Sequence, residues 1–215
     1  MWQSGFRCEA ARVTSSLTEK QSLRKHYRAL RAAQSSQDYE AKCERIAEQF
    51  QELDGLRDAQ CIYTYLEFQV EVRTSGIAEQ LLRDRKRVLT TGADHKRAPA
   101  ETLCELTWVG GQLIQTPLAT TDIAQIDLFL VPGIVWDRLG YRVGFGGGYF
   151  DRLLASARAD ALKVGLAFEF QLIESVPREA WDIPVDVLIT ETRLHACTPA
   201  LPREGAFSNP PPATD

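Results

Sequence analysis

Apolar side chains recur at helical spacing from about Thr18 to Leu53. Two such faces are expected, one formed by Leu23, Tyr27 and Leu30 and the next by Tyr39, Cys43, Ile46, Phe50 and Leu53. The polar cluster Ser35-Ser36-Gln37-Asp38 lies between them, and we expect it to end the first helix and to cap the second. The chain is therefore predicted to open with two consecutive amphipathic helices.

Short β-rich runs then alternate with helical segments. The expected strands are Cys61–Leu66, a strand near Val88, Leu103–Val109, Ile126–Val131, Lys163–Phe168 and Val185–Thr190. The expected helices are Ser75–Arg87 and Tyr149–Ala157. This alternation predicts an α/β fold with a mostly parallel β-sheet flanked by helices on both faces, in a single domain with an N-terminal helical segment. We place that domain at residues 15–198 and expect disordered tails at 1–14 and 199–215, the latter rich in proline.

Ligands of such sheets bind outside the carboxyl ends of the strands. The segments that follow Leu66, Val131 and Thr190 leave those ends. We therefore expect Glu71, the glycine-rich loop after Val131 and the strand that carries Asp186 to lie at one edge of the sheet.

Composition excludes several classes of protein. The 215 residues suit one domain, and 25 Lys and Arg against 29 Asp and Glu lack the basic surplus of a nucleic-acid-binding protein. Five scattered cysteines without a CxxC pair, and three dispersed histidines, indicate free thiols in a reducing compartment and no zinc site. No apolar run is long enough to span a membrane, and residues 1–13 do not resemble a secretory signal, so we expect a cytoplasmic protein.

The segment from Val131 to Arg152, VPGIVWDRLGYRVGFGGGYFDR, is the most informative part of the chain. Four glycines in five residues, between a strand and a helix, suit a loop whose backbone N–H groups bind phosphate. Arg142 would add a positive charge, and Asp151 a carboxylate for a metal ion that accompanies the phosphates. The segment is neither a Walker A loop nor a dinucleotide fingerprint, and an ordinary turn with a helix-capping Asp151 is the alternative.

These residues resemble the signature of the 5-formyltetrahydrofolate cyclo-ligase family, which is close to PG-x-x-F-D-x-x-G-x-R-L-G-x-G-G-G-Y-Y-D-R. The matching positions are Pro132, Gly133, Asp137, Gly140, Arg142, Gly144, Gly146, Gly147, Gly148, Tyr149, Asp151 and Arg152. Lys20, Leu23 and Arg24 resemble the K-x-x-L-R pattern of the family. Gly165-Leu166-Ala167-Phe168 with Gln171, and Asp182 with Asp186 before Thr190-Glu191, resemble its C-terminal motifs.

The resemblance implies closure of 5-formyltetrahydrofolate, a reduced folate, to 5,10-methenyltetrahydrofolate with ATP and Mg²⁺. We expect the protein to be a monomer or a weak homodimer. It implies ATP contacts from Lys20, Arg24, Arg142, Gly144, Gly146, Gly147, Gly148, Tyr149 and Phe150. It implies folate contacts from Leu66, Glu71, Phe145 and Tyr149, with Arg142, Tyr149 and Glu71 in catalytic roles. By the same resemblance Asp151 and Asp186 are the Mg²⁺ ligands.

The chain also departs from the family pattern. Phe150 replaces a tyrosine, and the segment from Thr90 to Pro117 lacks the usual Leu-Pro and G-I-x-E-P motifs. Glu67 is a second candidate for the carboxylate role given to Glu71, and the basic residues near Lys20 also suit a solvated helix face. Two other functions therefore stay open: an ATP-dependent enzyme that acts on a different formyl or amide substrate, and a non-catalytic module that binds folate or nucleotide.

Overall fold

The computed structural model describes residues 5–92, 103–119 and 122–197, with side chains from residue 17 onward. The predicted C-terminal tail, 199–215, and part of the divergent segment 90–117 lie outside the described residues. No helix in the described part of the chain is both long enough and apolar enough to cross a bilayer.

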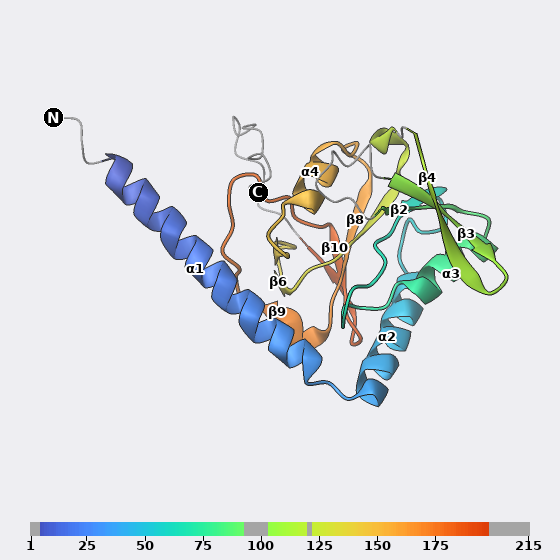
Figure 1. The fold of residues 1–215 in the computed structure, drawn as a ribbon, viewed down its shortest axis with the longest axis horizontal. Coiled ribbons are helices and arrows are strands. Elements are labelled where there is room, and N and C mark those ends of the chain that lie inside the picture. Colours follow the sequence, from blue (N-terminus) through green and yellow to red (C-terminus); the bar gives the residue numbers. More distant parts are fainter. Residues whose placement is uncertain (1–4, 93–102, 120–121, 198–215) are drawn as a thin grey trace.

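Two helices open the chain (Figure 1). Helix α1 (Gly5–Ala32) begins well before the expected start near Thr18, and it includes residues 5–14, where a disordered tail was predicted. Helix α2 (Ser36–Gln51) is capped as expected, because the Ser35 hydroxyl accepts a hydrogen bond from the backbone N–H of Asp38 at 3.1 Å. The limits of the domain themselves stay a prediction.

The central sheet has eight strands in the order β11-β10-β8-β5-β1-β2-β3-β4. Their bounds are β1 Cys61–Tyr63, β2 Arg87–Thr91, β3 Leu103–Val109, β4 Gln112–Pro117, β5 Leu128–Val131, β8 Leu162–Leu166, β10 Val187–Ile189 and β11 Leu194–Ala196. The five strands from β10 to β2 are parallel, and antiparallel strands extend the sheet at both edges. The prediction of a mostly parallel sheet in an α/β fold is confirmed.

Some elements were absent from the sequence prediction. Strands β4 and β11 pair at the sheet edges, and a second sheet joins β7 (Arg142–Val143), β6 (Val135–Asp137) and β9 (Leu172–Ile173). The strands of this second sheet contain only two or three residues, so their sequence carries too little periodicity to be detected. Short one-turn helices occur at Ile123–Gln125 and Glu169–Gln171.

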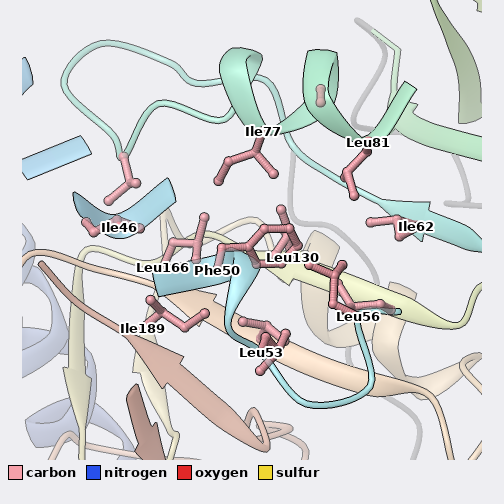
Figure 2. Close-up of a cluster of buried hydrophobic side chains, with 14 of the residues drawn as sticks. Ile46, Phe50, Leu53, Leu56, Ile62, Ile77, Leu81, Leu130, Leu166 and Ile189 are labelled. Atoms are coloured by element: carbon pink, nitrogen blue, oxygen red, sulfur yellow. The ribbon is translucent and has the colours of Figure 1, made fainter. Parts of the chain in front are cut away.

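Helices cover both faces of the central sheet, as predicted. Helix α2 and helix α3 (Ser75–Arg83) bury Ile46, Phe50, Ile77 and Leu81 against one face, where Figure 2 shows them meeting strand residues such as Leu130. Helix α4 (Tyr149–Ala155) packs Leu153 and Leu154 on the opposite face. Because the parallel strands are buried on both faces, they consist mainly of apolar residues.

Helix α1 packs against the small sheet rather than the large one. Leu23 and Tyr27 contact a cluster formed by Val135, Val143 and Val176, whereas Leu30, expected on the same face, is 40% exposed. The N-terminal part of α1 extends beyond the rest of the molecule in Figure 1. Its C-terminal half therefore lies beside the segment that leads into the glycine-rich loop.

Gly140 provides a stability test of the turn before β7. It has a φ of +85°, and a Cβ there would lie 2.4 Å from the carbonyl oxygen of Val185. Gly140→Ala should therefore lower the free energy of unfolding by about 3 kcal/mol or more, and the Tm by roughly 6–12 °C. The matched control is Gly76→Ala, at an exposed position of α3 with open space around it, which should raise stability by up to about 1 kcal/mol. Equal melting temperatures for the two variants would contradict the close contact at Gly140.

Candidate active site

The glycine-rich loop and the segment after β1 leave the same edge of the central sheet. Strand β1 ends at Tyr63 and leads to Glu71, while β5 ends at Val131 and leads through the small sheet to residues 144–148. The ring of Phe150, in the first turn of α4, lies 5.9 Å from the ring of Tyr63. The segment after β1 and the first turn of α4 therefore lie at the same, carboxyl edge of the sheet.

The loop backbone adopts conformations that only glycine accepts readily. Gly146 and Gly148 have φ values of +110° and +61°, and Gly148 is the residue before the first turn of α4. No atom lies within 4 Å of the position that a Cβ would occupy at Gly144 or Gly147. A ligand can therefore approach the backbone closely at these two positions.

Three arginines surround this loop. The Nε of Arg24 donates to the carbonyl of Gly144 at 2.8 Å, and Nη1 of Arg152 donates to the carbonyl of Gly147 at 2.8 Å. The Arg28 guanidinium lies 5.0 Å from the centroid of the Phe145 ring, in cation–π contact. Within the part of the chain that the structure describes, none of the three forms an ion pair with a carboxylate. Their positive charge is therefore available to an anionic ligand.

Burial and the neighbouring cation Arg28 lower the pKa of Arg24. Burial disfavours the charged form of the guanidinium because it removes the charge from water, and the like charge of Arg28 disfavours that form by repulsion. Arg28 and Arg152 were not assigned roles from the sequence. Arg28 could have been found because it stands four residues after Arg24, on the same helix face.

Lys20 and Arg142, by contrast, have acidic partners. Lys20 Nζ lies 3.1 Å from Asp182 and 3.9 Å from Glu179. Arg142, with 5% of its side chain exposed, donates Nη2 to Asp151 Oδ1 at 2.8 Å and Nη1 to the carbonyl of Ile183 at 2.7 Å. Of the predicted cationic ATP contacts, only Arg24 therefore lies at the loop without an acidic partner in the described part of the chain.

The two predicted metal ligands lie at different places. Asp151, in the first turn of α4, is at the carboxyl edge, and its Oδ1 accepts hydrogen bonds from Arg142 and from Ile183 N. Asp186 stands just before β10, at the opposite edge, where its Oδ2 pairs with Lys163 Nζ at 3.0 Å. The expectation that Asp186 lies at the ligand edge was wrong, because the residue precedes its strand instead of following it. No cluster of three or more His, Cys, Asp or Glu suited to a metal occurs among the described residues.

The structure separates the roles of the two candidate carboxylates. Both oxygens of Glu67 accept hydrogen bonds from Thr74 and Ser75 at the start of α3. In Glu71, Oε2 accepts from Phe68 N at 2.9 Å, but the buried Oε1 has no hydrogen-bond partner among the described residues. Glu67 therefore stabilises a helix end, and Glu71 keeps one oxygen available for a ligand.

These environments shift the two pKa values in opposite directions. Burial raises the pKa of Glu71, and the hydrogen bond from Phe68 and the nearby charge of Arg31 only partly oppose it. Burial also disfavours the charged form of Glu67, but the hydrogen bonds from its own backbone, Ser75 and Thr74 outweigh burial and lower its pKa.

The remaining predicted contacts border the same edge. Tyr149 is 9% exposed and its ring lies 5.5 Å from that of Phe150, while Leu66 is partly buried against the core. Phe145 is 43% exposed on the loop. The cysteines with described side chains are buried, as expected for Cys43 and Cys61, and burial raises the pKa of Cys61 to about 11, so this thiol is not an activated nucleophile.

A sequence profile of the 5-formyltetrahydrofolate cyclo-ligase family matches residues 16–191, which is most of the chain. The chain belongs to this family. The match includes α1 from residue 16, the glycine-rich loop and β10, so it contains every residue placed at the site above.

Individual relatives agree with this assignment. The 5-formyltetrahydrofolate cyclo-ligase of Escherichia coli K12 is 29% identical over 147 residues, which cover 63% of this chain and 80% of the relative. The NMR structure of Aquifex aeolicus 5,10-methenyltetrahydrofolate synthetase superposes with a TM-score of 0.69 at 30% identity, over 88% of this chain and 99% of the other. The Mycoplasma pneumoniae 5,10-methenyltetrahydrofolate synthetase, at 24% identity and a TM-score of 0.66 over 80% of this chain and 99% of the other, shares the fold.

Replacing each carboxylate by its amide tests the distinction between Glu67 and Glu71. Because the pKa of Glu71 is raised on folding, its contribution to stability is greatest when it is protonated and falls as the pH rises through the folded-state pKa. Glu71→Gln should remove this pH dependence and raise the free energy of unfolding at pH 7 by about 1 kcal/mol. Glu67→Gln should lower it by roughly 1–3 kcal/mol through loss of the helix cap. Thermal melts between pH 4 and 8 measure both, and a less stable Glu71→Gln variant at pH 7 would contradict the assignment.

Proposed function

We propose that this chain is an ATP-dependent 5-formyltetrahydrofolate cyclo-ligase that forms 5,10-methenyltetrahydrofolate and releases ADP and phosphate. Family membership supports the reaction class. The observation that carries the proposal lies at one sheet edge. There the structure places a glycine-rich loop beside arginines that have no acidic partner among the described residues, and a buried carboxylate with one oxygen that has no partner among them either. One half suits a polyphosphate and the other an N–H-rich heterocycle.

The proposed chemistry explains why ATP is consumed. A formamide carbon is a poor electrophile, and its oxygen is a poor leaving group. Transfer of the γ-phosphoryl group to the formyl oxygen makes that oxygen displaceable, N10 then attacks the formyl carbon, and phosphate departs with the oxygen as the ring closes. The protein has to align the formyl oxygen with the γ-phosphate and to stabilise negative charge on the transferred group.

In this proposal Arg24, Arg28 and Arg152 bind the phosphates of ATP together with the backbone N–H groups of Gly144 to Gly148. Arg24 and Arg152 already hold loop carbonyls, so they also fix the direction in which the loop amides point. Lys20 and Arg142 are positioning residues in this proposal. The ion pair of Lys20 with Asp182 holds α1 against the 182–183 segment, and the ion pair of Arg142 with Asp151 holds the two ends of the glycine-rich loop together. Tyr149 and Phe150 border the nucleotide where α4 begins.

The folate would occupy the part of the edge that follows β1. Glu71 Oε1 accepts N–H bonds from the pterin ring, and its raised pKa is expected to fall when those donors arrive. Leu66, Phe145 and Tyr149 would provide apolar contacts around it. Glu71, Tyr149 and Arg142 thus keep roles close to those implied by the resemblance, with Arg142 moved from direct contact to positioning.

Mg²⁺ enters this proposal as part of the MgATP substrate. The ion is satisfied by one or two carboxylates together with phosphate oxygens and water. Asp151 lies at the correct edge for such a contact, but its Oδ1 is engaged by Arg142, and Asp186 lies at the other edge. The residues present therefore do not fit a protein-held site formed by these two aspartates.

Two alternative functions, an enzyme for another formyl or amide substrate and a non-catalytic binding module, predict different experimental results. A different formyl or amide substrate is favoured only by the divergent segment between Thr90 and Pro117. A non-catalytic module would bind ligands without forming ADP. We further propose that the protein acts on a reduced folate as a monomer or weak homodimer in the cytoplasm, and that it contacts neither nucleic acid nor membrane.

The direct test is absorbance of the methenyl product after purified protein is mixed with MgATP and 5-formyltetrahydrofolate. Product formation that requires ATP and is matched by ADP release would establish the activity. ADP release only with other formamides would point to a different substrate. Ligand binding without any ADP release would establish the non-catalytic alternative.

The arginines around the loop provide a sharper prediction. Arg24→Ala and Arg28→Ala should each raise the KM for ATP by about 10-fold or more, because each removes a charge-assisted contact worth roughly 1.5–3 kcal/mol. The KM for the folate should stay within about twofold. Lys25→Ala removes the same charge from an exposed position of the same helix, and it serves as the control. A rise in the ATP KM as large in Lys25→Ala as in Arg28→Ala would show a general effect of charge instead of contacts at the loop.

A further inference from the structure

A buried arginine at the end of α1 is not used by the proposed mechanism. Arg31 is 3% exposed, and its Nε donates a hydrogen bond to the carbonyl oxygen of Val70 at 2.9 Å. Burial lowers the pKa of Arg31, and the negative charge of Glu71 opposes that shift. A charged group is costly to bury, so a guanidinium close to the proposed folate ligand requires a physical explanation.

Arg31 is one of three side chains that hold three consecutive carbonyl groups. The hydroxyl of Tyr39, in α2, donates to the carbonyl of Glu71 at 2.8 Å, and the hydroxyl of Tyr65 donates to the carbonyl of Val72 at 3.0 Å. With the bond from Arg31, the backbone is held at Glu71 and on both sides of it. The Glu71 carboxylate is therefore supported by its surroundings before any ligand binds, as a preorganised binding group requires.

Helix α1 also holds the other half of the site. The Nε of Arg24 donates to the carbonyl of Gly144, in the glycine-rich loop, at 2.8 Å. Arg31 follows Arg24 by seven residues, which is close to two helical turns, so the two side chains leave nearly the same face about 10 Å apart along the axis. One helix thus connects the loop proposed for ATP to the segment proposed for the folate.

The spacing of these two segments matters for the proposed reaction, because the formyl oxygen has to meet the γ-phosphate. A misplacement of about 1 Å in such a site can lower the rate by about 10²-fold. Groups that are fixed to a helix keep their spacing more precisely than groups carried by loops alone. The two arginines of α1 therefore suit the task of setting the distance between the two substrates.

We propose that Arg31 is a positioning residue, which fixes Glu71 relative to the glycine-rich loop through the carbonyl of Val70 and through its own charge. The inference rests on the proposed function and deepens it. The hydrogen bond holds the backbone next to Glu71, and the positive charge favours the ionised carboxylate. The ionised form is the one that accepts N–H bonds with both oxygens.

The alternative is that Arg31 only stabilises the fold. Tyr39 provides the matched control, because it donates to the next carbonyl of the same segment, adds no charge and belongs to α2 instead of α1. Arg31→Met and Tyr39→Phe each remove one hydrogen bond to this segment. A purely structural role predicts that the two variants have the same kinetic properties.

The first measurement is steady-state formation of the methenyl product. Arg31→Met should lower kcat by about 10-fold or more, because the two substrates are no longer aligned. The KM for ATP should stay within about twofold, since the contacts at the loop are retained. Arg31→Lys keeps the charge and a donor, so its kcat should return to within about threefold of wild type. Tyr39→Phe should also stay within about threefold.

The second measurement is the pH dependence of kcat/KM for the folate, which reports groups of the free enzyme. Burial raises the pKa of Glu71, and the Phe68 N–H and the Arg31 charge oppose that rise. The charge of Glu67 adds to it. Without the Arg31 charge the pKa of Glu71 should rise further, so in Arg31→Met the fall of kcat/KM on acidification should begin at a higher pH. Arg31→Lys and Tyr39→Phe should keep the wild-type profile.

Several results would overturn the inference. A kcat and a pH profile of Arg31→Met that match those of Tyr39→Phe would leave Arg31 with a structural role alone. A raised KM for ATP with unchanged kcat would assign it to the phosphate contacts. If melting curves show that Arg31→Met does not fold, Arg31→Gln, which removes the charge but keeps a polar side chain, is measured with the same expected results. Wild-type protein that forms no methenyl product would instead overturn the proposed function, and this inference with it.

Discussion

The buried guanidinium of Arg142 is the interaction on which the arrangement of this site depends. It joins three segments, because it extends from β7, donates to Asp151 in α4 and donates to the carbonyl of Ile183 before β10. A buried charge is strongly destabilising if either partner is lost, so these segments are held together as a unit. The glycine-rich loop lies between Arg142 and Asp151 in sequence, and its two ends are therefore fixed relative to each other before any ligand binds.

This constraint determines which cations remain for a ligand. Arg142 is neutralised by Asp151, and Lys20 by Asp182, so neither has unbalanced charge. The charge at the loop comes instead from arginines that bind backbone carbonyls or an aromatic ring, contacts that orient a guanidinium without cancelling its charge. A phosphate group can then gain nearly the full electrostatic attraction without first displacing a carboxylate.

Local patterns in the sequence were sufficient to predict the layers of the fold and to identify the glycine-rich loop as a candidate site. The apolar runs around Ile62, Leu130 and Val164 and the cap at Ser35 were strong local signals, and the structure confirms them. No pattern in the sequence predicts which side chains, far apart along the chain, form hydrogen bonds or ion pairs with each other. The sequence shows Glu67 and Glu71 as equivalent acidic residues, and only the packing of the start of α3 against Glu67 distinguishes them. The position of Asp186 was missed because the register of β10, not its composition, decides at which edge the residue lies.

The two halves of the site are prepared in opposite ways, and this difference has a physical consequence. The loop half presents excess positive charge that water can partly solvate, so its cost in the free protein is small. The other half contains the buried Oε1 of Glu71, which has no hydrogen-bond partner among the described residues and is costly until a ligand donates to it. A ligand that donates a hydrogen bond to this oxygen therefore removes the free-energy cost of leaving it unpaired. Binding at the loop half depends instead on electrostatic attraction and should weaken as the salt concentration rises. A reaction that must align two different substrates gains from this division, because each half can select its own ligand by different chemistry while the Arg142 contacts keep the segments between them fixed.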